Sequence, residues 1–116
     1  MEVSRERRKH ERTVVNWPVV VVTPQRYIGG EAKNISVGGA AVVCTRDPGR
    51  SEPLRLAIKI PTSEELLQVT GVVVWSNLTA QLNDLYGCET GIRFTSFIGK
   101  SRQYLVEAIA ECLRLK

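Results

Sequence analysis

The sequence predicts an all-β domain, a six-stranded antiparallel β-barrel with one C-terminal α-helix. Three observations support this class. Apolar, β-branched segments recur between residues 13 and 94, turn-forming or polar stretches separate them, and only residues 99–116 show helical periodicity. Consecutive strands with short connections pair antiparallel. Six such strands are expected to close into a small barrel, because closure removes exposed edges.

Each predicted strand has its own signal. The strands are residues 13–23, 27–34, 40–44, 54–60, 66–75 and 87–94. The first is rich in valine and ends at Pro24, while Pro18 predicts an edge position or a bulge. Gly29-Gly30 loosens the second strand, and residues 54–60 alternate between apolar and polar. The polar, mixed stretch 76–86 predicts a mobile loop.

The C-terminal helix is predicted from apolar residues at steps of three and four. These residues are Leu105, Ala108, Ile109, Cys112 and Leu113. We expect this stripe to cover one opening or side of the barrel. Trp17 is expected in the core or at the rim, with Phe94 and Leu105 as neighbours.

Composition restricts the class of protein. The 116 residues predict one domain without an internal linker, and 43% hydrophobic residues is ordinary for a globular protein. Three widely spaced cysteines without a CxxC pair predict free, mostly buried thiols in a reducing compartment, hence a cytoplasmic location. No signal peptide is recognisable, and the longest apolar run, residues 40–44, predicts no membrane insertion.

Catalytic, metal and cofactor sites are not predicted. His10 is the only histidine, and the sequence places no nucleophile beside it. One histidine and three scattered cysteines do not form a zinc site. The adjacent Glu64 and Glu65 lack a third group for acid–base chemistry, and the glycine-rich phosphate-binding motifs are absent.

Residues 1–12 differ from the rest of the chain. They contain five of the sixteen basic residues and no apolar periodicity, so we expect a flexible segment, followed by the barrel and helix over 13–116. The segment is either a solvated tail or a ligand-binding arm, because arginine pairs well with phosphates and guanine edges. Net charge beyond it is only +2, which is too small for a protein that tracks nucleic acid.

Two motifs together favour the binding arm. The stretch Arg8-Lys9-His10-Glu11-Arg12 resembles the RxxxR motif of the PilZ domain family, and Asn34-Ile35-Ser36-Val37-Gly38-Gly39 resembles its [D/N]xSxxG motif. Residues 71–75 and 91–94 resemble later strands of the family. The resemblance covers roughly residues 5 to 115. It implies a six-stranded barrel with a C-terminal helix, and a receptor for the bacterial second messenger cyclic di-GMP without enzymatic activity.

The resemblance also implies the ligand contacts. Arg8 and Arg12 would contact guanine edges and phosphates, Asn34 and Ser36 would hold a guanine, and Gly39 would let the backbone approach. Arg7 extends the basic run and is expected to assist. Trp75 is either a core or rim aromatic or a stacking partner for a base.

The expected mechanism is that ligand binding orders residues 1–12 and presents a new surface to an unidentified partner protein. Two alternatives stay open. One is a PilZ-like adaptor that acts by protein contact without the nucleotide. The other is a small barrel that binds RNA or single-stranded DNA, which the low net charge and few aromatic residues disfavour.

Overall fold

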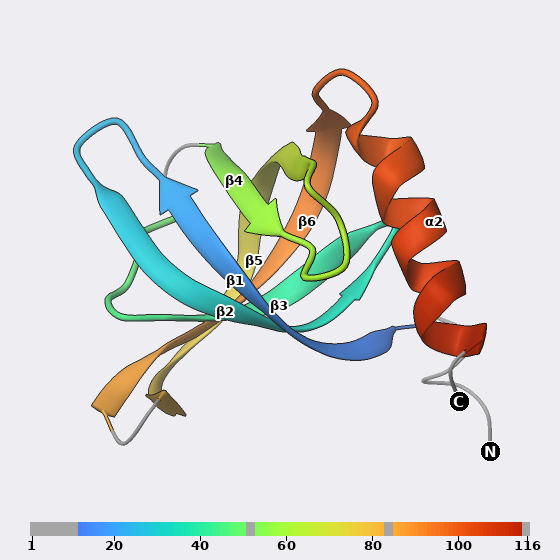
Figure 1. The fold of residues 1–116 in the computed structure, drawn as a ribbon. Helices are drawn as coiled ribbons and strands as arrows, with labels where there is room; N and C mark the ends of the chain where they lie inside the picture. The colour runs from blue at the N-terminus through green and yellow to red at the C-terminus, as the bar shows by residue number, and fades with distance from the viewer. Residues whose placement is uncertain (1–11, 51–52, 83–84, 115–116) are drawn as a thin grey trace, which may run out of the picture.

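The protein folds as a closed antiparallel β-barrel with one helix against it (Figure 1). The computed structural model describes residues 12–50, 53–82 and 85–114, and the side chains of residues 79–82, 85 and 86 are left out of the description. Around the barrel the strands follow the order β1-β2-β3-β6-β5-β4. The elements are β1 (Thr13–Val22), β2 (Tyr27–Ser36), β3 (Gly39–Cys44), β4 (Leu54–Lys59), β5 (Leu66–Leu82), β6 (Leu85–Phe97) and α2 (Ser101–Arg114). The predicted fold class is confirmed.

Strand β1 is supported unevenly along its length. It pairs with β2 from Thr13 to Val22, but its ladder with β4 begins only at Val19. A register shift between Val14 and Trp17 precedes Pro18, so the predicted bulge is confirmed. Strand β1 as a whole is not an edge strand, but Pro18 has a ladder partner only on the β2 side, which agrees with the predicted edge position. Pro18 has no N–H group to donate to a neighbouring strand. This is tolerated there because the β4 ladder begins only at Val19.

The predicted loop over residues 76–86 is largely strand. Strand β5 continues to Leu82, and β6 starts at Leu85, so the two form a hairpin that projects beyond the barrel (Figure 1). Ser76, Asn77 and Leu78 are exposed. The sequence contained a strand signal here, because Leu78, Ala80 and Leu82 alternate with Thr79 and Gln81. The polar pairs on either side, Ser76-Asn77 and Asn83-Asp84, favoured the loop prediction instead.

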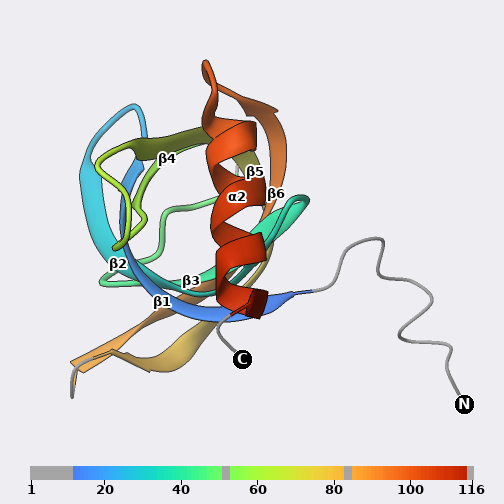
Figure 2. The same cartoon turned by 45° about the vertical axis from the view of Figure 1, so that its right-hand side comes forward.

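The core fills the barrel and extends to α2. Trp17, Phe94 and Leu105 belong to one buried cluster, as predicted. Helix α2 lies across one end of the barrel (Figure 2). Its Ser101 hydroxyl accepts a hydrogen bond from the Gln68 amide at 2.9 Å, which fixes the helix start to β5. Gly99 has φ of 60°, so the helix begins at Ser101 rather than at the predicted residue 99.

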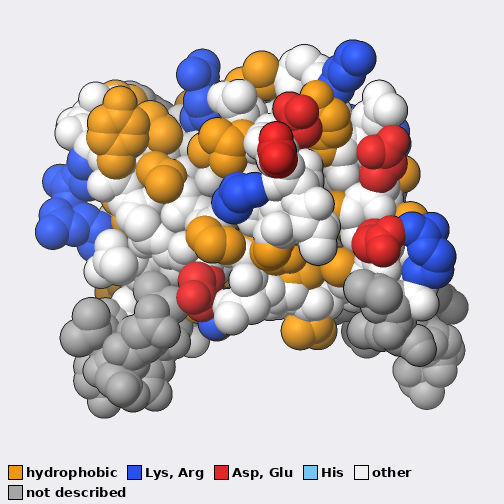
Figure 3. All heavy atoms as spheres, viewed as in Figure 1, with side chains coloured by type: hydrophobic (Ala, Val, Ile, Leu, Met, Phe, Trp, Pro, Cys, Tyr) orange, Lys and Arg blue, Asp and Glu red, His pale blue; other side chains and the backbone are white. Residues whose placement is uncertain are grey.

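The protein holds its cysteines mostly in the interior. Cys44 and Cys88 are buried, Cys112 is half-buried, and all three are free thiols, as predicted. On the face shown in Figure 3, basic, acidic and apolar side chains are interspersed. Among the described residues, no helix combines the length and the apolar character needed to cross a membrane.

Candidate functional site

The two sequence motifs meet on the outside of the barrel. Arg12 stands just before β1, and Asn34 pairs with Val14 of β1. Across this pairing, Nη1 of Arg12 donates a hydrogen bond to Oδ1 of Asn34 at 2.6 Å. The structure therefore brings one residue of each motif into contact, although 22 positions separate them. Arg7 and Arg8 lie outside the described residues.

Ser36 belongs to the tight turn between β2 and β3. Its Oγ accepts a hydrogen bond from the Gly38 amide at 3.1 Å and lies 3.5 Å from the carbonyl oxygen of Gly39, to which it donates. The side chain is 4% exposed. Ser36 thus stabilises the turn that follows Asn34, and its hydroxyl has one remaining lone pair for another donor.

Gly39 is required for strand packing. A Cβ atom built on it would lie 2.3 Å from the carbonyl oxygen of Ile92 in β6. Its φ is not in the left-handed region, since the glycines with positive φ among the described residues are Gly49 and Gly99. The close approach at Gly39 is therefore that of the β6 backbone.

Strand register places four site residues in one row on the outer surface. Asn34 pairs with Ala41, Ala41 with Gly91, and Gly91 with Trp75. Paired residues point to the same side of a sheet. Residues next to them, such as Ala40 and Ile92, lie in the core, so this row faces outward. We call Asn34, Ala41, Gly91 and Trp75 the outer row. Three strand spacings of about 4.8 Å make it about 14 Å long.

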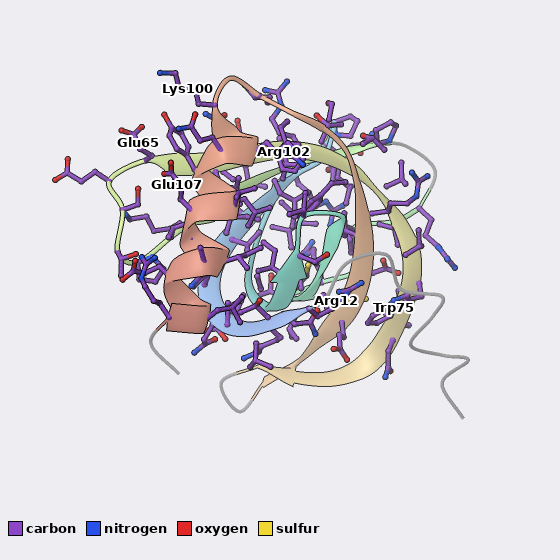
Figure 4. All side chains as sticks on the ribbon, turned by 90° about the vertical axis from the view of Figure 1, so that its right-hand side faces the viewer. Arg12, Glu65, Trp75, Lys100, Arg102 and Glu107 are labelled. Atoms are coloured by element: carbon purple, nitrogen blue, oxygen red, sulfur yellow. The ribbon has the colours of Figure 1, made fainter. Side chains whose placement is uncertain are left out.

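Trp75 closes the far end of the outer row. A Cβ atom on Gly91 would lie 2.1 Å from Nε1 of Trp75 and 2.2 Å from its Cε2, so the indole rests directly on the Gly91 backbone. The side chain is 40% exposed and is not part of the core cluster. The core alternative for Trp75 is therefore wrong. Figure 4 shows Arg12 and Trp75 on the same side of the barrel.

A second row beside the first adds a basic residue that the sequence interpretation missed. Ser36 pairs with Gly39, Gly39 with Arg93, and Arg93 with Val72. Arg93 is exposed on the outer face, between the buried Ile92 and Phe94. A charged residue between two buried apolar ones was the available signal, because alternate residues of a strand face opposite sides.

Arg50 is the other residue that sequence reasoning missed. Its guanidinium Nη2 donates a hydrogen bond to the carbonyl oxygen of Val74 at 2.6 Å. Val74 is the extra residue where the β5–β6 register shifts, immediately before Trp75. Arg50 comes from the β3–β4 connection, and no local pattern in the sequence marks it.

The electrostatics of this face favour an anionic ligand. Arg12 and Arg93 lie on the outer row or beside it, and Arg50 reaches the strand that carries Trp75. Glu31 and Glu89 lie on the opposite flank, where both pair with Val43, and Glu31 forms a salt bridge with Lys33 at 2.8 Å. An anion is therefore expected on the Arg93 side of the outer row.

The cysteines offer no reactive group to this face. Burial, and after it the neighbouring Cys88, raises the pKa of the Cys44 thiol to about 12, so the thiolate is disfavoured near neutral pH. Among the residues that the structure describes, no three histidine, cysteine or acidic side chains group as metal ligands would.

Comparisons with known proteins identify the fold. The structure of the Bacillus subtilis inhibitor of motility (MotI/DgrA) matches with a TM-score of 0.70 and 24% identity, covering 95% of this chain and 52% of that one. This chain thus spans about half the length of that protein's chain. The PilZ domain of Escherichia coli YcgR with c-di-GMP matches with a TM-score of 0.72 and 11% identity, covering 94% and 93%. A comparison with curated protein sequences finds no match.

The sequence itself carries the family assignment. The sequence model of the PilZ domain matches residues 6–111, which includes both motifs, all six strands and most of α2. The barrel order and the junction of Arg12 with Asn34 agree with this match. The chain therefore belongs to the PilZ domain family.

Proposed function

We propose that this protein is a receptor for cyclic di-GMP that binds the nucleotide on the outer row. The observation that carries the proposal is the Arg12–Asn34 hydrogen bond, which joins the two motifs at one end of a row that ends in an exposed indole. The E. coli PilZ domain of similar fold was solved with this nucleotide. The reaction class is binding without chemical conversion.

Each residue has a proposed role in binding. Arg8 and Arg12 contact guanine edges and phosphates, with Arg7 assisting. Asn34 holds a guanine, and the remaining lone pair of Ser36 accepts from the same base. Trp75 stacks its exposed face on a base. The Trp75 indole covers Gly91, while Ala41 and Gly39 carry no long side chain, so a flat ligand can lie between Asn34 and the indole.

The proposed signalling step depends on the position of Arg8 and Arg12 in the chain, directly before β1. Residues 1–11 lead directly into Arg12 and β1, so a ligand held by Arg8 and Arg12 draws this segment against the barrel. We infer that the ordered segment and the ligand together form the surface that a partner protein recognises. Amide exchange with and without cyclic di-GMP tests this step. Equal protection of the segment in both states would contradict it.

The second candidate is an adaptor that binds a partner protein without the nucleotide. One observation favours it. The acceptor oxygen of Asn34 is engaged by Arg12, and the hydroxyl of Ser36 is engaged in its turn, so both groups already have partners within the chain. Nucleotide binding then requires Arg12 to exchange one partner for another, which reduces affinity.

Isothermal titration calorimetry separates the two candidates. The receptor proposal predicts saturable heat with cyclic di-GMP, loss of that heat in Arg8→Ala and Arg12→Ala, and none with GTP or cyclic di-AMP. Arg26→Ala is a charge-matched control, since Arg26 lies in the β1–β2 turn, outside both motifs. Absence of heat from folded wild-type protein would instead support the adaptor.

A further inference from the structure

The position of Trp75 depends on an irregularity in β5. The β5–β6 ladder pairs Val73 with Ile92 and Trp75 with Gly91, so Val74 is an extra residue opposite no partner. A bulge of this kind leaves a residue out of the ladder and redirects the side chains that follow it. If this bulge were lost, a one-residue slip would turn Trp75 toward the opposite face of the sheet.

Among the residues that the structure describes, none of β4 pairs with Val74. The β4–β5 ladder ends at the Leu54–Gly71 pair, three residues before Val74. A backbone carbonyl without a partner costs free energy unless water or a side chain satisfies it. Arg50, four residues before β4 begins, supplies the donor through its 2.6 Å hydrogen bond to the Val74 carbonyl oxygen. The guanidinium is charged, which strengthens this bond relative to a neutral one.

We infer that Arg50 is a positioning residue for Trp75. It holds the Val74 bulge from the β3–β4 connection, while the Gly91 backbone supports the indole from below. These two contacts fix the exposed face of the ring on the outer row. The inferred effect on nucleotide affinity rests on the proposed function, whereas the effect on the ring itself does not.

Fluorescence quenching by acrylamide tests the effect on the ring without any ligand. The two tryptophans differ strongly in exposure, since Trp17 is 6% exposed and Trp75 is 40% exposed, so quenching reports mainly on Trp75. The Trp75→Phe variant measures the contribution of Trp17 alone. Arg50→Ala is expected to raise quenching, up to a limit of about 2.5-fold for a fully released ring. Arg46→Ala, a charge-matched change at an exposed position of the same connection, is expected to leave quenching unchanged. Equal quenching in Arg50→Ala and wild type would overturn the inference.

A double-mutant cycle then tests how Arg50 acts on cyclic di-GMP binding. Stacking on an aromatic ring contributes a substantial share of binding, so Arg50→Ala is expected to raise Kd by about fivefold, and Arg50→Lys by less. In a Trp75→Ala background, Arg50→Ala is expected to have no further effect. An undiminished effect in that background would show direct contact between Arg50 and the nucleotide, and would overturn the positioning role.

These outcomes remain distinguishable from failure of the proposed function. If folded wild-type protein gives no heat with cyclic di-GMP, the receptor proposal fails. The quenching comparison of Arg50→Ala with Arg46→Ala still decides whether Arg50 positions Trp75. Urea denaturation of both variants identifies any rise in quenching that comes from general unfolding rather than from release of Trp75.

Discussion

Asn34 is the residue at which the two motifs meet, and its chemistry limits the site. A side-chain amide has one oxygen to accept hydrogen bonds, and Arg12 already donates to it. A carboxylate at the same place would have two acceptor oxygens and a negative charge. It could bind Arg12 with one oxygen and the N–H groups of a guanine with the other.

Asn34→Asp is therefore expected to tighten cyclic di-GMP binding. The decrease in Kd is expected to be about tenfold, because a charge-assisted hydrogen bond to the guanine replaces a neutral one. Calorimetric titration measures the change, and Asn34→Ala is the control that is expected to weaken binding. A Kd for Asn34→Asp equal to that of wild type or higher would contradict this reasoning.

At the scale of elements, the contact between β3 and β6 decides the shape of the site. All six residues of β3 are buried, including Ala41 and Val43, which face outward. The two backbones approach closely at Gly39, where a Cβ atom would lie 2.3 Å from the Ile92 carbonyl oxygen. Any side chain at Gly39 must push the two strands apart, because a strand backbone cannot yield as a flexible side chain does.

Gly39→Ala is expected to lower the free energy of unfolding by about 2 kcal/mol, as other overpacking substitutions do. The matched control is Gly29→Ala in β2, where nothing lies within 4 Å of the new Cβ atom and a change within about 0.5 kcal/mol is expected. Urea denaturation measures both. Similar midpoints for the two variants would show that β3 and β6 separate without cost.

The elements also show what the sequence can predict. Strand β1 was predictable from its β-branched residues, and β4 from its alternation of apolar and polar residues, of which Leu54, Leu56 and Ile58 are buried. The hairpin of β5 and β6 was missed, because the polar pairs Ser76-Asn77 and Asn83-Asp84 indicated a loop although residues 78–82 alternate between apolar and polar. The motif residues Arg12 and Asn34 were identified, and the structure places them in contact.

The outer row was beyond prediction for a different reason. It depends on strand register, and the β5–β6 ladder alone contains three register shifts. Each shift reverses the side to which the following residues point, so alternation cannot place Trp75 relative to Asn34. The role of Arg50 depends on one of these shifts, the Val74 bulge.

At the scale of the whole molecule, the barrel interior contains an ionisable group, the Cys44 thiol. Burial raises its pKa to about 12 from the ordinary value of 9.0. The folded state therefore keeps the proton that the unfolded state loses. The stability associated with the neutral thiol is fully present below about pH 9 and is lost as pH rises toward 12.

We expect the free energy of unfolding to fall between pH 9 and pH 11 more steeply in wild type than in Cys44→Ala. The variant is less stable at pH 8 because it leaves a cavity, but it lacks this titration. Denaturation at each pH measures both curves. Parallel curves would show that the Cys44 thiol ionises with similar ease in the folded and unfolded states.

The uneven pairing of β1 has a mechanical consequence for the arginine segment. Residues 13–18 have a neighbouring strand only in β2, whereas Val19 to Val22 pair with both β2 and β4. A pull on Arg12 therefore acts on the weaker half of the strand, and its hydrogen bonds can open while the closed part of the barrel stays intact. Such local opening requires less free energy than global unfolding. The N-terminal segment thus joins the barrel at the half of β1 that has a strand partner on one side only, where Trp17 anchors the strand in the core.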